Sequence, residues 1–330
     1  MIKITARCAG IAMNIIPSIF NEKNLNYTIL GNPNAPRKVL MDTSCVVLSR
    51  CDSHLKKIAF ENIKKIGFKE VFCLVDESVS FNAINFTQEF PELYFVVVHD
   101  KTNIGSLINL GVSLSTGSHV LVLHDDLCLE KLIFTPEMES NLTGLNKYAV
   151  VPALSKGTFK MSTQFSPDVV KSVFNVKTVE KPKNHNKTLY PFDFTCFLNR
   201  EKFMRLGGYD WTIDSPYWQN LDLSVRSWLW GEEIISLKYF TFTYGLDFPV
   251  EDRTADLSYL RFYLKNLLPV YNVDHASLPK RKFFAFKFRN GCGIAESIRQ
   301  FKDARRWVEQ NKYRFKTSAF LLVRNWDSVI

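Results

Sequence analysis

Two adjacent carboxylates, Asp125 and Asp126, directly follow a run of apolar residues at 119–123 and a histidine, His124. Carboxylate oxygens are the ligands that Mg²⁺ and Mn²⁺ prefer, and such an ion commonly shares the phosphate oxygens of a substrate. One or two carboxylates are then sufficient, and the ion stabilises a departing diphosphate as a Lewis acid. A solvated loop, where Asp is common, is the alternative interpretation of this pair.

Polar residues also follow two other apolar runs. Ser49 and Arg50 come after the run 44–48, and Asp76-Glu77-Ser78 ends the run that begins at residue 70. Three runs that each end in polar or acidic groups indicate a functional site more strongly than any one of them.

The apolar runs alternate with helical patterns. Strands are expected at 44–48, 70–75, 93–99 and 119–123, with helices from Asp52 or Ser53 to Ile66 and from Asn103 to Leu114. This alternation predicts an α/β fold with a mostly parallel sheet. Because ligands bind at the carboxyl ends of parallel strands, the polar residues named above are expected to lie together.

The net charge of +9 is concentrated at one end of the chain. Residues 276–330 hold 13 basic and 4 acidic side chains, whereas the first 275 residues hold 29 of each. The isoelectric point of the whole chain therefore does not favour nucleic-acid binding. The basic, aromatic stretch 280–316 is predicted to contact an anionic membrane surface, and the alternatives are a solvated helix face, or binding of a phosphorylated acceptor or a nucleic acid.

The cysteines point to reduced thiols in a cytoplasmic protein. Their number is odd, there is no C-x-x-C pair, and several lie inside apolar runs, which argues against a zinc site. They are Cys8, Cys45, Cys51, Cys73, Cys128, Cys196 and Cys292. A spanning helix is not expected, because no run of about eighteen apolar residues occurs. The stretch 8–20 is interrupted by Asn14 and Pro17 and is not expected to be a signal peptide.

A series of motifs resembles family 2 glycosyltransferases. In the first half the motifs are Asn103-x-Gly105, Asn109-x-Gly111, Ser115-x-Gly117 and HVLVLHDD at 119–126; in the second half they are FLNREKFMRLGGYD at 197–210 and NLDLSVR at 220–226, followed by Gly231. Each is weak alone, but their order and spacing match over roughly residues 42–245. The resemblance implies a GT-A (Rossmann-like) fold, an α/β protein whose mostly parallel sheet is flanked by helices, here with a helical basic C-terminal extension.

The same resemblance divides the chain into three parts. Residues 1–37 form an N-terminal extension that ends in the turn-rich segment 31–37. Residues 38–254 form the GT-A-like domain, with a nucleotide-binding half at 38–130 and an acceptor half at 131–254. Residues 255–330 form the helical, basic C-terminal region.

The resemblance also implies roles for particular residues. The nucleotide-sugar donor is expected to contact Ser49, Arg50, Asp76, Asn103, Gly105 and Asp125. The metal, Mn²⁺ or Mg²⁺, is expected at Asp126, with Asp125 and His124. The catalytic acids near the acceptor are expected to be Asp210 and Asp222, with Asp214 as another candidate. Aromatic rings that stack on the acceptor sugar are expected to be Tyr209, Trp211 and Trp218, although core packing is the alternative for each.

Three departures from the family pattern bear on these roles. Gln219-Asn220 stands where the family usually has Glu-Asp, and an asparagine cannot accept the acceptor's proton as a base. Another acid must then act as base, or the acceptor needs a weaker base, or the chain has lost activity. His124 stands where the Asp-x-Asp motif has its first acid. It could bind the metal, donate a hydrogen bond to a metal ligand, or be a strand-end histidine whose hydrogen bonds serve only the structure. Tyr244 occupies the neighbourhood of a histidine that often contacts the metal.

The expected activity is transfer of a sugar from a nucleoside diphosphate to a glycan or lipid-linked acceptor in cell-envelope polysaccharide synthesis. Direct attack at the anomeric carbon would invert its configuration, as the resemblance implies. The alternative is a non-catalytic relative that binds a nucleotide sugar or glycan as an assembly subunit. The enzyme is expected in the cytoplasm, as a peripheral protein on the inner face of the membrane. A nucleic-acid partner is disfavoured by the neutral body and by the lack of RNA-binding motifs.

Overall fold

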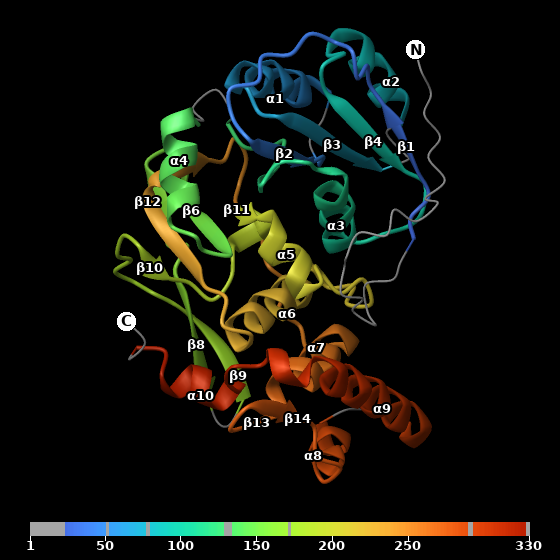
Figure 1. Cartoon of the computed structure of the whole chain (residues 1–330), viewed down its shortest axis with the longest axis vertical. Coiled ribbons are helices and arrows are strands. Elements are labelled where there is room, and N and C mark those ends of the chain that lie inside the picture. The colour runs from blue at the N-terminus through green and yellow to red at the C-terminus, as the bar shows by residue number, and fades with distance from the viewer. Residues whose placement is uncertain are drawn as a thin grey trace.

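The computed structural model describes residues 24–50, 53–76, 80–128, 134–170, 173–289 and 293–327. Its centre is a ten-stranded sheet that runs through both halves of the chain, in the order β1-β4-β3-β2-β5-β11-β6-β12-β10, with β7 paired to β6. Figure 1 shows this sheet in the upper and left parts of the molecule, and the elements from residue 257 onward gathered below it.

The first half contains the expected parallel strands. They are β2 (Thr43–Leu48), β3 (Glu70–Asp76), β4 (Tyr94–Val98) and β5 (His119–His124). β2 lies between β3 and β5 and is parallel to both. All six residues of β2 are buried, as expected of a strand covered on both faces.

The helices of this half are α1 (Ser53–Ile66), α2 (Ser80–Glu89) and α3 (Ile104–Leu114). Asn103 caps α3 by accepting a hydrogen bond from the Ser106 backbone N–H, as the sequence indicates. Gly111 lets α3 approach the sheet closely, because a Cβ there would lie 2.9 Å from the methyl groups of Val46. The strand and helix pattern of the α/β prediction is thereby confirmed.

The second half extends the same sheet with mixed strand directions. Its strands are β6 (Ala149–Lys156), β7 (Phe159–Met161), β10 (Asn186–Lys187), β11 (Cys196–Asn199) and β12 (Ile234–Thr243). β11 is inserted antiparallel between β5 and β6, whereas β12 is parallel to β6. The insertion of β11 joins the two halves through one continuous core.

The helices of this half are α4 (Pro136–Gly144), α5 (Arg200–Leu206) and α6 (Pro216–Leu229), with a 3₁₀ turn, η3, at Phe192–Phe194. Gly207, at φ +84°, ends α5 in the left-handed conformation that glycine adopts without strain. A separate hairpin, β8 (Phe165–Val170) with β9 (Val173–Thr178), packs toward the C-terminal region (Figure 1).

Part of the expected N-terminal extension belongs to the sheet. β1 (Tyr27–Leu30) pairs antiparallel with β4, with Tyr27 opposite Val98. Tyr27 and Leu30 are buried in the core. The segment before residue 24 lies outside the described residues.

The C-terminal region is mostly helical, as expected. It contains α7 (Leu257–Phe262), a π-helical turn η4 (Tyr263–Leu267), a hairpin of β13 (Val270–Asn272) and β14 (His275–Ser277), then α8 (Lys282–Arg289), α9 (Ile294–Asn311), η5 (Lys312–Arg314) and α10 (Ala319–Arg324). Trp307 of α9 is buried and its ring stacks near Trp230, which follows α6. This region therefore shares a core with the second half of the domain.

The described cysteines agree with the expectation of reduced thiols. Cys45, Cys73 and Cys196 are free and buried, and burial raises the pKa of each thiol. Cys128 is free and partly exposed. Cys8, Cys51 and Cys292 lie outside the described residues. Among the helices of the described ranges, none combines the length and apolarity that a bilayer crossing needs.

Candidate functional site

The expected meeting of strand ends occurs at β2 and β5. In their parallel register Leu48 lies opposite His124, so the loops after the two strands begin side by side at the carboxyl end of the sheet. Arg50 follows β2, and Asp125 and Asp126 follow β5. The Arg50 backbone N–H donates to Asp125 Oδ1 at 2.9 Å, which fixes the two loops to each other.

The Arg50 side chain holds two carboxylates at once. Its Nε and Nη2 donate to the two oxygens of Asp126 at 2.8 and 3.0 Å. Its Nη1 and Nη2 donate to the two oxygens of Asp193 at 3.0 and 2.6 Å. Burial alone would lower the pKa of Arg50, but the hydrogen bonds to Asp193 and Asp126 outweigh burial and raise it. We call Arg50, Asp126 and Asp193 the cation cluster.

Asp193 is a member that the sequence analysis missed. It lies in the turn before β11, with a left-handed φ of +52°, and its side chain is only 9% exposed. A non-glycine residue in this conformation costs energy and is found where the surrounding structure demands it. No periodicity or spacing marks Asp193 in the sequence, since the turn that carries it is irregular.

His124 and Tyr244 complete the surroundings of Asp193. His124 is 1% exposed, and burial lowers its pKa, which keeps the ring neutral at neutral pH. Its Nε2 lies 3.0 Å from the Asp193 carbonyl oxygen, an acceptor only, so Nε2 carries the proton. The Tyr244 hydroxyl donates to Asp193 Oδ2 at 2.8 Å. Tyr244 also bridges to Leu127 in the backbone, directly after Asp126.

The remaining residues expected at the donor lie in two places, at the ends of β2 and β3 and at the beginning of α3. Ser49 follows β2, and its backbone N–H donates to the Leu74 carbonyl of β3 at 3.3 Å. Asp76 ends β3 opposite Val98, and its side chain lies outside what the structure describes. Asn103 and Gly105 both form hydrogen bonds with Gln219, which lies in the second half of the domain.

Gln219 is a buried connector between the halves. Its Oε1 accepts from the Gly105 N–H at 2.8 Å, and its Nε2 donates to Asn103 Oδ1 and to the Asp210 carbonyl, each at 2.9 Å. A Cβ at position 105 would lie 2.5 Å from the Gln219 side chain, so glycine is required there. An amide both accepts and donates, which a glutamate in its ionised form cannot do.

Asp210 and Asp222, the expected catalytic acids, lie in a buried ion-pair network. Lys265 Nζ donates to Asp210 at 2.8 Å and to Asp222 at 2.9 Å. Arg226 donates to Asp222 Oδ2 at 2.9 Å, and Asn266 to its Oδ1 at 2.6 Å. Neither carboxylate has exposed surface. Their catalytic role stays a prediction, and the contacts observed are those of structural ion pairs.

The other two positions expected near the acceptor are Asp214 and Asn220. Asp214 is exposed. Asn220 is 2% exposed, and its Nδ2 donates to the Pro191 carbonyl at 2.6 Å. Because Pro191 is two residues before Asp193, Asn220 supports the turn that presents the cation cluster.

Glu251 is a second residue that the sequence analysis missed. Its side chain is 14% exposed, and its Oε2 accepts from the Tyr190 hydroxyl at 2.7 Å and from Arg253 at 3.1 Å. Burial, with a contribution from the charge of Asp193, raises the pKa of Glu251. Tyr190 adjoins Pro191, so Glu251 lies beside the turn that Asn220 supports.

The aromatic residues expected at the acceptor are mostly part of the core. Tyr209 is 2% exposed and Trp218 is 7% exposed. Trp218 stacks on Phe262 of α7 and donates its indole N–H to the Thr254 carbonyl at 2.8 Å. Trp211 is partly exposed. Of the three rings, Trp211 has the most surface for a sugar to contact.

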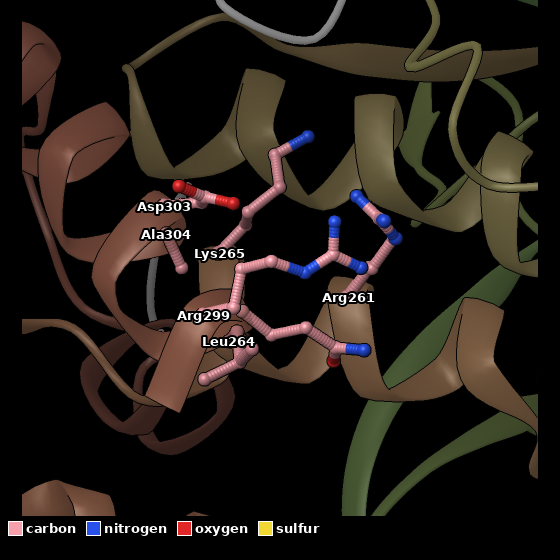
Figure 2. Close-up of a pocket in the computed structure, with 7 residues that line it drawn as sticks. Arg261, Leu264, Lys265, Arg299, Asp303 and Ala304 are labelled. Carbon is pink, nitrogen blue, oxygen red and sulfur yellow. The ribbon is translucent and has the colours of Figure 1, made fainter. Parts of the chain in front are cut away.

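A small pocket between η4 and α9 lies apart from the cation cluster. Figure 2 shows Arg261, Lys265 and Arg299 at this pocket. Each cationic head is already engaged: Arg261 donates to Thr212 Oγ1, Lys265 to the two buried aspartates, and Arg299 to Glu296. The pocket is therefore a gap beside the ion-pair network.

A divalent cation fits this site only in part. In the ranges that the structure describes, no three His, Cys, Asp or Glu side chains gather so that they could hold a metal ion. A cation that also binds phosphate oxygens needs only one or two carboxylates. Asp126 and Asp193 already share one cation, the guanidinium of Arg50. If the Arg50 side chain moved away, the charge and the hard oxygen donors of the two carboxylates would suit Mg²⁺ or Mn²⁺.

Comparison with solved structures shows the class of fold, which is GT-A-like. The chain resembles the crystal structure described as GalNAc-T7 with UDP, GalNAc and Mn²⁺, with a TM-score of 0.55 and 10% identity. The match covers 87% of this chain and spans 57% of the length of that protein. A structure of TarS residues 1–349 from S. aureus matches with a TM-score of 0.44 and 9% identity, over 82% of this chain and 71% of that one. No family model and no curated protein sequence matches the chain.

The ion-pair network predicts a large loss of stability for Lys265→Met. This change leaves Asp210 and Asp222 without their shared cation in a buried place, and breaking a buried pair costs about 3–5 kcal/mol. We expect a matching fall in the free energy of unfolding, measured by urea denaturation. Lys302→Met, the same change at an exposed position of α9, should leave it unaltered. Equal stability of the two variants would contradict a supporting role for Lys265.

Proposed function

We propose that the protein is a glycosyltransferase that transfers a sugar from a nucleoside diphosphate to a glycan or lipid-linked acceptor. The observation that carries this proposal is the cation cluster at the carboxyl ends of β2 and β5, in a chain with a GT-A-like fold. In sheets of this kind, ligands bind at the carboxyl ends of the strands. The donor would lie along this edge, with its nucleoside toward β3 and its diphosphate at the cluster.

The charge of the cluster supports the proposal that the diphosphate binds together with a cation. Asp126 and Asp193 carry two negative charges, and Arg50 balances only one of them. A diphosphate would be repelled unless further positive charge came with it. We propose that Mn²⁺ or Mg²⁺ is held by Asp126 and Asp193, and that Arg50 turns from these carboxylates to the diphosphate. When bound, the metal supplies Lewis-acid stabilisation of the leaving diphosphate.

Glu251 is our proposed base for the acceptor hydroxyl. It lies beside the turn that Asn220 supports, near the position where the family has its usual base. A carboxylate with a raised pKa is a stronger base, and a positioned base contributes about 10²–10⁴-fold to the rate. Asp214 is the exposed alternative, and Asp210 and Asp222 would need to leave their ion pairs to act. Direct attack by the activated hydroxyl would invert the anomeric centre.

A second candidate is a non-catalytic relative that binds a nucleotide sugar or glycan as an assembly subunit. Two observations favour it: Asn220 stands at the usual base position and supports a turn, and the two nearby acids are engaged by Lys265. Such a protein would bind a nucleotide sugar without consuming it.

Donor turnover separates the two candidates. We expect the wild type to release nucleoside diphosphate from UDP- or GDP-sugars with Mn²⁺ present, measured by chromatography. Asp126→Asn should lower this turnover about 100-fold, a usual cost of removing one group that stabilises a transition state electrostatically. Asp274→Asn, at an exposed turn, serves as the control. Binding of the donor without turnover in the wild type would favour the non-catalytic candidate, and equal turnover in both variants would contradict the role of Asp126.

The base assignment predicts a particular pH dependence. Glu251 must be deprotonated to act, so transfer should fall as the pH drops through its pKa. Because burial raises that pKa above the ordinary value of 4.5, the fall should begin at a higher pH than for an exposed glutamate. Glu251→Gln should lower the rate of transfer to an acceptor and remove this step from the pH profile. Glu309→Gln, the same change at an exposed position, should leave the rate and the pH profile unchanged. An unchanged profile in Glu251→Gln would refute the assignment.

A further inference from the structure

α8 exposes two phenylalanines to solvent. Phe284 is 65% exposed and Phe288 is 88% exposed, and their spacing of four residues places them on one side of the helix. The opposite side of α8 is anchored, since Phe286 is fully buried and Phe283 packs edge-on against Phe301 of α9 at 5.5 Å. The core thus takes two of the four phenylalanines and leaves two outside.

The beginning of α9 repeats this arrangement. Ile294 is 67% exposed and Ile298 is 39% exposed, again four residues apart. α8 and α9 pack against each other, so these exposed apolar side chains lie on two adjacent helices, and exposed large apolar side chains in one region of a protein are a mark of an interaction site. We call Phe284, Phe288, Ile294 and Ile298 the apolar outer surface.

Basic side chains flank this apolar outer surface. Lys280 and Arg281 are exposed directly before α8, and Lys302, Arg305 and Arg306 are exposed along α9. Two of the acids in this part of the chain, Glu296 and Asp303, lie next to arginines of α9. Lys312 likewise pairs with Glu309. Because residues 276–330 hold 13 basic and only 4 acidic side chains, this part of the chain keeps a net positive charge that attracts an anionic partner.

Cations and exposed aromatic rings together select the chemistry of that partner. A free phosphate would use the cations but leave the apolar side chains in water, and a single-stranded nucleic acid would stack its bases on the phenylalanines but leave Ile294 and Ile298 in water. An apolar protein groove would cover the rings but not the lysines and arginines. The surface of an anionic bilayer offers negative headgroups to the cations and an apolar interior to Phe284 and Phe288.

The position of α8 permits such contact without covering the cation cluster. Figure 1 shows α8 at one end of the long axis of the molecule, opposite to α1 and α2. We propose that α8 and the beginning of α9 dock on an anionic membrane surface through the apolar outer surface and its flanking cations. This inference is independent of the activity proposed above, because none of its residues belongs to the cation cluster.

Vesicle binding by the full chain tests the inference. We expect it to sediment with vesicles that mix phosphatidylcholine and phosphatidylglycerol, and about tenfold less with phosphatidylcholine alone, because each basic residue near the surface adds attraction. The paired change Phe284→Ser and Phe288→Ser should lower binding to the anionic vesicles about tenfold, as should Lys280→Glu with Arg281→Glu. Phe159→Ser, at a phenylalanine that is 62% exposed on β7, is the matched control and should bind like the wild type.

Two results would overturn the inference. One is equal binding of the wild type to neutral and anionic vesicles. The other is full binding by the Phe284→Ser, Phe288→Ser variant together with competition by RNA, which would assign the cations to a polyanion instead. Equal melting temperatures of the variants and the wild type, recorded in parallel, ensure that altered binding reports on the surface and not on unfolding.

Discussion

The arrangement of the candidate site depends on two carboxylates that must share a cation. Asp126 comes from the parallel half of the sheet and Asp193 from the turn before β11, and one guanidinium lies between them. Arg50 is therefore a link between loops that are 76 and 143 residues away from it in sequence. The left-handed backbone of Asp193, the hydroxyl of Tyr244 and the amide of Asn220 all support this one contact.

A second shared cation stabilises the second half of the domain. Lys265 joins Asp210, which follows α5, to Asp222 within α6, and so fastens the C-terminal region to the domain. Two buried carboxylates and two buried cations, Lys265 and Arg226, balance one another there. Acids engaged in this way hold the protein together, which is why we assign the base to Glu251, outside the network.

The sequence predicts the parts of the site that follow regular elements. Asp125, Asp126 and Arg50 come after apolar runs, and parallel pairing brings the ends of such runs to one edge of a sheet. Asp193 could not be predicted, because an irregular turn positions it and no pattern marks such a turn. The surroundings of Asp222 were equally hidden, since they depend on Lys265, which is 43 residues away. The roles of Gln219 and Asn220 were hidden as well, because each amide connects segments that are distant in sequence.

We propose that the Arg50 guanidinium occupies the place of a metal ion and moves away when the ion binds. Electron paramagnetic resonance of Mn²⁺ without nucleotide tests this competition directly, because it measures the concentration of the free ion. Arg50→Gln removes the competing charge and leaves Asp126 and Asp193 facing each other, so it should bind Mn²⁺ about tenfold more tightly than the wild type, equivalent to about 1.4 kcal/mol. Adding Asp193→Asn to this variant should reverse the gain. Equal Mn²⁺ affinity in the wild type and Arg50→Gln would contradict the claim.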